Sequence, residues 1–524
     1  ENEGDIVLSR IKKHIGRVAG LCSRLLVLTA VLLAGWQGSA SADVTGFRYS
    51  AGPTKVRLVF DLDKPAAFRV PGDDGKTLKD SLDILLDTGA GKKVVPEVKD
   101  PLVKSIGLER GKKDCGIRLS LDRPVQYKVF TLKGPDRLVV DLYRIAIIRT
   151  EKDLGGGLRY TFWQDDMNGH PVQLHILSLA PGSAYELRPF SGKPGSTGRG
   201  KLQEIATGLG AKAAINACYF DMAGGWIIGN CKWDGVFHGT ETIPRSAFVV
   251  DEKGNPMVLQ DLSYTGEIEF PREIPGQRVW PVTGVNRPRL ENDLVVYNGE
   301  HGMSTGTNEF GFEVKLVEKK AENPAEKKRS SRKAARKKAE AVNAEAAPGV
   351  WTGTVTERSD KGNMTLLPGT LVLSGYGKNA AAIKMLQIGD MITMRESLGN
   401  PVADRARFVL GAGPSLLTAG KVDVRAVRER MAPDIARGRA PRTAVGVKAD
   451  GTVLLLVVDG RSQLSHGMTL TELAAYLQHL GAVQAVNFDG GGSSEMVLDG
   501  NILNRPSGGK ERPVSVGLGV FPRG

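Results

Sequence analysis

The stretch Ala482-Val-Gln-Ala-Val-Asn-Phe-Asp489 is followed directly by Gly490-Gly-Gly-Ser-Ser494. Its valine-rich run predicts a buried strand that ends on Asn487 and Asp489. The three glycines allow positive φ angles and the close approach of a ligand, and serine hydroxyls and backbone N–H groups can bind an oxyanion. A polar turn between two strands is the alternative interpretation. Because no Gly-Lys-Ser/Thr follows, a nucleotide P-loop is not expected.

The residues before this stretch predict a hairpin and a helix that lead into it. Residues 442–447 and 452–460 are apolar runs joined by Asp450-Gly451, which is typical of a β-hairpin. Thr469-Leu-Thr-Glu472 is a capping box. Apolar residues then recur at helical spacing until Gly481, which predicts a helix that ends there.

The whole chain of 524 residues has the length of two to four domains. Its 65 glycines indicate many turns and a β-rich fold. Residues 43–145 contain short alternating strands between Pro, Gly and Asp turns, which predicts an all-β sandwich. Residues 146–157 are interpreted as a linker, and residues 158–524 as a larger α+β (mixed α/β) domain.

The N-terminal residues resemble an export signal. Four basic residues up to Arg17 precede the apolar run 25–34, and Ala40-Ser-Ala42 follows. We therefore predict a signal peptide at residues 1–42 and a location in the periplasm, the cell wall or the extracellular space. A membrane anchor is the alternative, but the run is shorter than the roughly 20 residues that a spanning helix needs. No other stretch predicts a transmembrane segment.

The formal net charge is +13, and part of it lies in one low-complexity segment. Residues 315–347 hold eleven Lys and Arg against five Glu. This segment is interpreted as a solvated insertion. A nucleic-acid partner is not expected for an exported protein, so anionic envelope polymers or lipid surfaces explain the charge better.

Three of the four cysteines follow the predicted signal peptide: Cys115, Cys218 and Cys231. A disulfide between Cys218 and Cys231 is the natural pairing, because both lie in one predicted domain of an exported protein. No Cys and His spacing resembles a zinc site. No cofactor is required by the sequence, although Asp459, Asp489 and Asn487 are compatible with a divalent cation.

Polar residues gather at predicted strand ends, which can converge on one cleft when the strands share a sheet. Carboxylates suit general acid and base catalysis, and arginine forks suit phosphate oxygens. Each residue taken alone also has an ordinary structural explanation. The catalytic candidates are Asp489, Asp459 and Asp221. The binding candidates are Asn216, Arg245, Arg442, Thr443, Asn487, Gly490, Gly491, Ser493 and Arg512. No Gly-x-Ser-x-Gly is present, so a serine-hydrolase triad is not expected.

The order of several motifs resembles the phosphodiester glycosidase family, which includes the mannose-6-phosphate uncovering enzyme. The motifs are Ile215-Asn-Ala-Cys-Tyr-Phe-Asp221, Gly411-Ala-Gly-Pro414, Arg442-Thr-Ala-Val-Gly-Val447, Val458-Asp-Gly-Arg461, Asn487-Phe-Asp-Gly-Gly-Gly-Ser-Ser494 and Arg512-Pro-Val514. This sequence departs from the family where Ala217 and Cys218 stand in place of the usual glycines.

This resemblance implies an enzyme that hydrolyses a sugar-1-phosphodiester in an envelope or extracellular glycan, releasing the sugar and leaving a phosphomonoester. Arginines would neutralise the phosphate, and Asp489 or Asp459 would activate water or stabilise the oxocarbenium-like sugar. A non-catalytic protein that binds a cell-wall or other anionic glycan is the alternative. Residues 43–145, with Val44-Thr-Gly-Phe-Arg-Tyr49 and strands ending in Asp-Leu, resemble an AMIN domain. That resemblance implies binding to peptidoglycan or another envelope polymer.

Overall fold

The computed structural model describes residues 42–524 except 53, 74–77, 88–95, 111–114, 145, 168, 274–275 and 319–348. Residues 1–41 of the predicted signal peptide and most of the basic insertion therefore lie outside the described residues. The chain divides into two compact units, Glu1–Arg144 and Ile145–Gly524. Of the helices in the described part, none combines the length and the apolar character that a membrane crossing requires.

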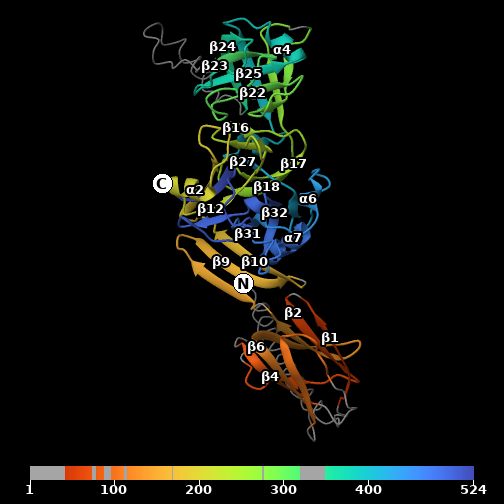
Figure 1. Ribbon diagram of the computed structural model, residues 1–524. Helices are drawn as coiled ribbons and strands as arrows, with labels where there is room; N and C mark the ends of the chain where they lie inside the picture. Colours follow the sequence, from red (N-terminus) through yellow and green to blue (C-terminus); the bar gives the residue numbers. More distant parts are fainter. Residues whose placement is uncertain are drawn as a thin grey trace, which may run out of the picture. The chain divides into compact units, whose positions relative to one another are not determined.

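All described elements of the first unit are strands, as the sequence predicted. They are β1 (Val44–Ala51), β2 (Lys55–Leu62), β3 (Phe68–Arg69), β4 (Lys79–Leu86), β5 (Val103–Arg110), β6 (Cys115–Leu132) and β7 (Arg137–Tyr143). Their order is β1-β2-β7-β6-β4-β3, with β5 also paired to β6. In β2 every second residue is buried, which is the alternation expected of a strand with one face on a core. Figure 1 draws this unit in red and orange.

The second unit is built on an eight-stranded main sheet with the order β29-β28-β32-β30-β31-β10-β9-β8. Its strands are β8 (Ile148–Asp153), β9 (Leu158–Met167), β10 (His170–Leu179), β28 (Ser415–Thr418), β29 (Lys421–Val422), β30 (Arg442–Lys448), β31 (Val453–Val458) and β32 (Ala482–Asn487). The predicted hairpin is confirmed as β30 and β31. The predicted strand before Asp489 is confirmed as β32.

Two further sheets of the second unit pack against the main sheet, and they are called here the facing sheet and the middle sheet. The facing sheet has the order β11-β35-β12-β33-β34 and contains β11 (Tyr185–Ser191), β12 (Ala213–Asn216), β33 (Met496–Leu498), β34 (Asn501–Ile502) and β35 (Val516–Pro522). The middle sheet has the order β16-β15-β27-β17-β18 and contains β15 (Cys231–Trp233), β16 (Val236–Gly239), β17 (Arg245–Val250), β18 (Pro256–Leu262) and β27 (Phe408–Gly411). A short pair, β13 (Tyr219–Phe220) and β14 (Ile227–Ile228), accompanies them.

An eight-stranded inserted sheet lies in the sequence between β18 and β27, with the order β20-β19-β26-β24-β23-β25-β22-β21. Its strands are β19 (Thr265–Glu269), β20 (Val279–Val282), β21 (Gly284–Val285), β22 (Leu294–Tyr297), β23 (Gly311–Glu318), β24 (Val350–Ser359), β25 (Thr370–Tyr376) and β26 (Met391–Ser397). The first four residues of the predicted basic insertion thus belong to β23, because Val314 and Leu316 pack in the core of this sheet.

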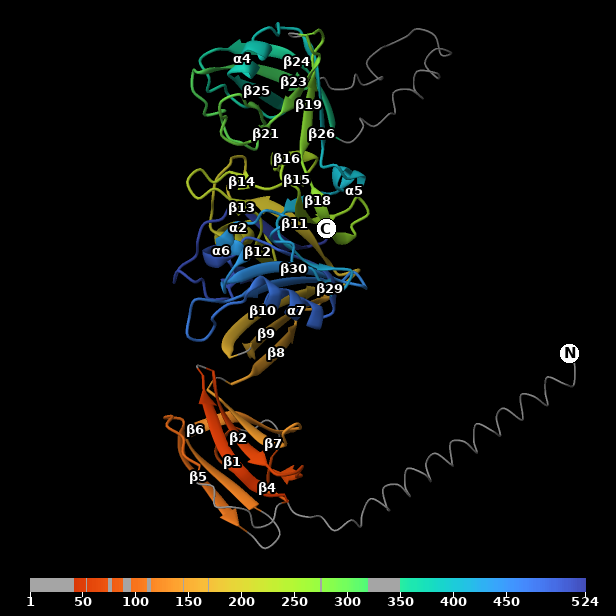
Figure 2. The ribbon, with the colours of Figure 1, turned by 90° about the vertical axis from the view of Figure 1, so that its right-hand side faces the viewer.

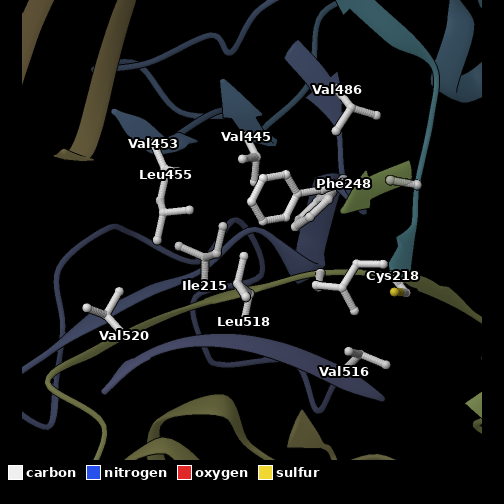
Figure 3. Close-up of a cluster of buried hydrophobic side chains, with 14 of the residues drawn as sticks. Ile215, Cys218, Phe248, Val445, Val453, Leu455, Val486, Val516, Leu518 and Val520 are labelled. Atoms are coloured by element: carbon white, nitrogen blue, oxygen red, sulfur yellow. The ribbon is translucent and has the colours of Figure 1, made fainter. Parts of the chain in front are cut away.

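The middle sheet is buried on both faces. Phe248, Leu410 and other residues of one face join the core shared with the main and facing sheets, and Figure 3 shows part of this cluster. Ala247, Val249 and Val409 of the opposite face join the core of the inserted sheet. Both ribbon views accordingly place the middle sheet between its neighbours (Figures 1 and 2).

The described helices are few and short. They are α2 (Leu202–Gly208), α4 (Lys378–Ile383), α5 (Pro401–Arg405), α6 (Pro433–Ala436) and α7 (Leu470–His479). The predicted capping box is confirmed at the start of α7: Thr469 bonds the backbone of Glu472, and Glu472 bonds back. Leu473, Ala474 and Leu477 pack on the face of the main sheet that is turned away from the facing sheet.

Two predictions about the second unit need correction. The protein is mostly β, so the predicted α+β class is confirmed only in part. The physical reason is that α7, with 10 residues, is the longest described helix, while the other four have 4 to 7 residues. The predicted linker is the second correction, since residues 148–153 form β8 and pair with β9.

Candidate active site

Two strand ends of the main sheet bring predicted site residues to one edge. β31 and β32 both run antiparallel to β30, so they end at the same edge, where β30 begins with Arg442. Asp459 follows β31 and Asp489 follows β32. Two strand spacings separate these ends, which is roughly 10 Å. After β32 the chain crosses to the facing sheet through residues 488–495, here called the glycine loop. This loop contains the 3₁₀ turn Gly491–Ser493.

Asn216, at the end of β12, ties the two ends of the glycine loop together. Its Nδ2 donates to the backbone oxygen of Asp489 at 2.7 Å, and its Oδ1 accepts from the backbone N–H of Glu495 at 3.1 Å. The same Oδ1 accepts from Thr443 Oγ1 at 2.7 Å. Asn216 and Thr443 were predicted to bind the substrate, and that role stays a prediction. Both are buried, and their hydrogen bonds within the protein hold the loop in place.

Asp489 lies in the glycine loop itself, directly after Phe488, which follows the end of β32. Its backbone N–H donates to Ala217 O at 2.8 Å, which fixes the main chain. Burial raises the pKa of Asp489 to about 6, against the opposing effects of a hydrogen bond from Ser493, the Gly490 N–H and the charge of Arg512. A carboxyl group with a pKa near neutrality is well suited to accept a proton.

Asp459 lies at the same edge but is engaged in the fold. Its Oδ1 accepts from Asn504 Nδ2 at 3.2 Å and from the Arg505 N–H at 2.9 Å. Its Oδ2 lies 3.6 Å from His175 Nε2, and His175 Nδ1 lies 2.8 Å from the Tyr160 hydroxyl. Burial, with the charge of Asp459, raises the pKa of Tyr160 to about 12. The contacts of Asp459 are therefore made with residues 504–505 and with β10 rather than with the glycine loop, and its predicted catalytic role stays a prediction.

Asp221 is placed in a turn rather than with Asp489. Its Oδ1 accepts from the N–H groups of Ala223 and Gly224, at 2.9 and 2.6 Å. Asp side chains commonly stabilise turns in this way. None of its contacts in the described part of the chain involves the glycine loop, so its predicted catalytic role gains no support.

The guanidinium of Arg442 is occupied by the protein. It donates to the backbone oxygens of Met468, Ile435 and Gly438 at 3.0, 3.1 and 3.0 Å. The side chain is buried, and burial lowers its pKa. Arg442 was predicted to bind phosphate, but its donors are directed at carbonyl groups, so it fastens the segments around α6 and α7 to β30.

Two other arginines lie directly against the glycine loop. A Cβ added to Gly491 would lie 3.4 Å from Arg461 Nη2, and a Cβ added to Gly492 would collide with the guanidinium of Arg512. Arg512 Nη1 also lies 3.5 Å from Ser493 Oγ. Arg461 is exposed and has a positive φ of 59°. Within the described residues it makes no hydrogen bond or ion pair, which leaves its fork free for a ligand.

Several buried polar atoms around this loop have no partner among the described residues. They are Arg245 Nε, Asn487 Oδ1, Ser494 Oγ and Glu495 Oε1. Asn487 Nδ2, in contrast, donates to the Tyr219 hydroxyl and to Gly413 O. Burial raises the pKa of Tyr219, and the charges of Asp489, Arg442 and Arg245 also act on it, which places these groups in one neighbourhood. Buried polar atoms without partners are rare in proteins and are consistent with a site that binds water or a polar ligand.

The structure thus brings together most of the predicted residues and adds others. Arg461, rather than Arg442, lies exposed against the glycine loop. Glu495 and Glu511 were not predicted as site residues. Burial, together with the nearby Glu511 carboxyl group, raises the pKa of Glu495 to about 9. Their only signal in the sequence is position, since Glu495 follows the two serines and Glu511 precedes Arg512.

A metal centre gains no support from this arrangement. Among the residues that the structure describes, no three His, Cys, Asp or Glu side chains are grouped so that they could hold a metal ion. The cation site considered for Asp459, Asp489 and Asn487 therefore remains a hypothesis without a matching cluster.

The two cysteines of the predicted disulfide lie next to each other, close to Asp489. Both are buried free thiols, and their Sγ atoms are 2.7 Å apart. Cys218 follows Ala217, whose carbonyl accepts the Asp489 N–H. The pairing itself stays a prediction.

We expect Cys218 and Cys231 to form a disulfide when the protein is produced in an oxidising compartment. Peptide mapping without reduction should yield a linked peptide pair, and a Cys231→Ser variant should be less stable by about 3 kcal/mol, since the bond closes a short loop. Alkylation of both thiols in unreduced protein would contradict the expectation. Cys115, in the other unit, is the internal control and should be alkylated once the protein is unfolded.

Residues 341–521 match the model of the phosphodiester glycosidase family. N-acetylglucosamine-1-phosphodiester alpha-N-acetylglucosaminidase of Mus musculus is 41% identical over 66 residues, which is 13% of this chain and 13% of that protein. The SPbeta prophage-derived uncharacterized protein YomE of Bacillus subtilis is 40% identical over 74 residues, 14% of this chain and 12% of that protein. The chain therefore spans only a small part of the curated relatives that it matches.

Two solved structures resemble the chain over most of its length. A hypothetical protein from Synechocystis has a TM-score of 0.59 at 20% identity, covering 93% of this chain and 82% of that one. A protein of Burkholderia pseudomallei K96243 described as exported has a TM-score of 0.51 at 18% identity, covering 88% and 97%. These likenesses concern the fold alone. The predicted family resemblance is confirmed for residues 341–521, and the AMIN-like resemblance stays a prediction.

Proposed function

We propose that the second unit hydrolyses glycosyl-1-phosphodiesters, releasing the sugar and leaving a phosphomonoester on the acceptor. One observation carries the proposal: Asp489, with its raised pKa, lies on a glycine loop against which two guanidinium groups are placed. The family match of residues 341–521 supports it, since Asp489, Arg461 and Arg512 all fall within that segment.

In the proposed reaction a water oxygen bonds to the anomeric carbon while the bond from that carbon to the phosphate oxygen breaks. The electron pair of the broken bond stays on the phosphate oxygen, and the proton of the water passes to the Asp489 carboxylate. The substrate phosphate carries one negative charge and the product phosphate two. Because this charge grows as the bond breaks, Arg461 and Arg512 bind the transition state more strongly than the substrate.

The glycines have a physical role in this arrangement. At Gly492 a side chain would occupy the place of the Arg512 guanidinium. At Gly490 a Cβ would lie 2.9 Å from Pro441 O, closer than real Cβ contacts. Glycine therefore lets the loop and the arginine pack together, and leaves the substrate phosphate room beside them.

We also propose that the protein is exported and acts on an envelope or extracellular glycan, with the first unit binding peptidoglycan or another envelope polymer. The signal-like residues 1–42, the net charge of +13 and the AMIN-like motifs of residues 43–145 support this part of the proposal.

The test is sugar release by the full chain from a panel of glycosyl-1-phosphodiesters. Wild type should release sugar and phosphomonoester in equal amounts. Arg512→Met should lower kcat/KM about a hundredfold, because it removes a donor to the developing charge. Arg505→Met is the matched control: the Arg505 side chain is exposed on the same 503–515 loop, so this variant should retain activity.

A non-catalytic glycan-binding protein is the rival outcome. The hydrogen bonds of Asp459 and Asp221 are made outside the glycine loop, whereas those of Asp489 are made within it. Binding of the same phosphodiesters without turnover, weakened by Arg512→Met, would favour that function over hydrolysis.

A further inference from the structure

Glu429 is a carboxyl group that the proposed reaction does not use, and it is completely buried. It lies in the turn between β29 and α6. Its Oε1 accepts from Ser246 Oγ at 2.7 Å and from the Ser415 N–H at 2.9 Å. Its Oε2 accepts from the Ser246 N–H at 3.1 Å. Because a buried carboxyl group is costly unless it is hydrogen-bonded, these three bonds are needed wherever Glu429 is kept inside the protein.

The two serines that bind Glu429 belong to different sheets. Ser246 lies in β17 of the middle sheet, and Ser415 is the first residue of β28 in the main sheet. The chain passes from β27 of the middle sheet to β28 through Ala412-Gly413-Pro414, here called the sheet corner. The Ala412 N–H donates to Ser246 O at 3.1 Å. Ser246 therefore holds one end of the sheet corner, and Glu429 holds the other through Ser415.

The glycine of the sheet corner lies directly against the Glu429 side chain. A Cβ added to Gly413 would lie 2.6 Å from Glu429 Oε2, closer than real Cβ contacts. Gly413 also has a φ of 125°, which residues with a side chain rarely adopt. Glycine at this position of the Gly411-Ala-Gly-Pro414 motif thus lets the sheet corner and the carboxyl group pack together.

The sheet corner is also bonded to the end of β32. The Gly413 N–H donates to Asn487 O at 2.9 Å, and the Asn487 N–H donates to Pro414 O at 3.0 Å. Asn487 Nδ2 donates to Gly413 O at 3.1 Å and to Phe488 O at 2.7 Å. Because Phe488 immediately precedes Asp489, the backbone that carries the Asp489 carboxylate is fixed to the sheet corner.

The same carboxyl group supports the start of β17. Ser246, which bonds Glu429 through both its N–H and its hydroxyl, follows Arg245. The charge of Arg245 acts on Tyr219, and the Tyr219 hydroxyl donates to Gly413 O at 2.8 Å. Glu429 therefore holds in place two chain segments that reach the candidate site, one that ends at Asn487 and one that begins at Arg245.

We infer that Glu429 is a positioning residue, which holds the sheet corner and, through Asn487, places Asp489 for the attack of water. This inference rests on the proposed function. Arg461 and Arg512 reach the glycine loop from other segments, after β31 and from the 503–515 loop. Loss of Glu429 should therefore displace the carboxylate that accepts the proton more than the groups that bind the phosphate.

The first test separates kcat from KM in sugar release by the full chain. Glu429→Gln keeps one acceptor oxygen but directs an amide N–H group at a serine donor. Its kcat should fall about tenfold while KM changes less than about twofold, and Glu429→Ala should lower kcat about a hundredfold, the scale of a 1 Å misplacement. Glutamine thus rescues part of the activity that alanine removes. Wild-type kcat in both variants, or a rise in KM alone, would overturn the inference.

A milder variant keeps this test valid if the alanine variant does not fold. Ser246→Ala removes only the 2.7 Å hydrogen bond to Glu429 Oε1 and leaves the carboxyl group in place. Its kcat should fall about threefold with KM unchanged, since the start of β17 and the sheet corner are held less firmly. An unchanged kcat in both Ser246→Ala and Glu429→Gln would overturn the inference.

Glu313 provides the matched control, because it is another completely buried carboxyl group of the second unit. It accepts hydrogen bonds from three hydroxyl groups and one backbone N–H, all between β18 and β27: Thr305, Thr307, Ser374 and Met364. Glu313→Gln should lower the thermal stability about as much as Glu429→Gln but keep the wild-type kcat and KM. An equal loss of kcat in both glutamine variants would show a general effect of stability and overturn the inference.

Hydrogen exchange followed by mass spectrometry needs no turnover, so it separates failure of this inference from failure of the proposed function. The N–H groups of residues 487–489 all donate to carbonyl groups of the protein. In Glu429→Gln, peptides covering residues 486–495 should exchange about tenfold faster than in wild type, and in Glu313→Gln they should not. Unchanged exchange of these peptides in Glu429→Gln would overturn the inference. Faster exchange in a protein that releases no sugar would contradict the proposed function and still support the role of Glu429 in placing Asp489.

Discussion

Replacing Asp489 with Asn is expected to lower sugar release about a thousandfold, the scale of removing a general base. The amide has nearly the same shape as the carboxylate but cannot accept the proton of the attacking water. The fold should survive, because the contacts that fix this position are made by the backbone: the Asp489 N–H bonds Ala217 and its carbonyl bonds Asn216. The variant should be at least as stable as wild type at neutral pH, since it no longer keeps a charge in a position where burial disfavours it.

The same carboxyl group should produce the acid limb of the pH profile. Below about pH 6 Asp489 becomes protonated, so kcat/KM of wild type should fall as the pH decreases through that value. The measurement is initial sugar release between pH 4 and pH 8, with folding checked by circular dichroism. Asp499→Asn is the matched control, because Asp499 lies at the turn before β34 and pairs with Lys212 at the surface. Full activity of Asp489→Asn would show that the Asp489 carboxylate does not take part in the reaction.

The elements around the site are predictable from the sequence because their signals are local. The Asp-Gly turn at 450–451, the capping box at Thr469 and the apolar run before Asp489 each depend on neighbouring residues, and all three form as predicted. The short helices are harder to predict, because sequences of 4 to 7 residues show too little of the helical period. The small share of helix therefore became clear only from the structure.

The roles of individual polar side chains depend on direction, which sequence patterns do not contain. Arg442 and Arg461 look alike in the sequence, since each adjoins an apolar strand of one hairpin. In the structure Arg442 points into the protein and meets three carbonyl groups, whereas Arg461, at a positive φ, lies exposed against Gly491. Asp459 and Asp489 differ in the same way, because only the folded chain brings Asn504 and Arg505 to Asp459.

Replacing Arg442 with Met is expected to destabilise the second unit by about 3–5 kcal/mol, because the backbone oxygens of Met468, Ile435 and Gly438 would lose their donor. Methionine keeps much of the buried volume, so the loss reports on the hydrogen bonds. Urea unfolding followed by tryptophan fluorescence suits this test, since Trp163, Trp226, Trp233, Trp280 and Trp351 all lie in the second unit.

Arg461→Met is the matched variant for Arg442→Met, because it removes the same group from an exposed side chain. Its stability should stay within about 0.5 kcal/mol of wild type. Its kcat/KM should nevertheless fall about a hundredfold, like that of Arg512→Met, since a donor to the phosphate is lost. A stable and inactive Arg461→Met beside an unstable Arg442→Met would assign phosphate binding to Arg461 and structural support to Arg442. The reverse result, with Arg442→Met stable and inactive, would return the phosphate site to the residue that the sequence first indicated.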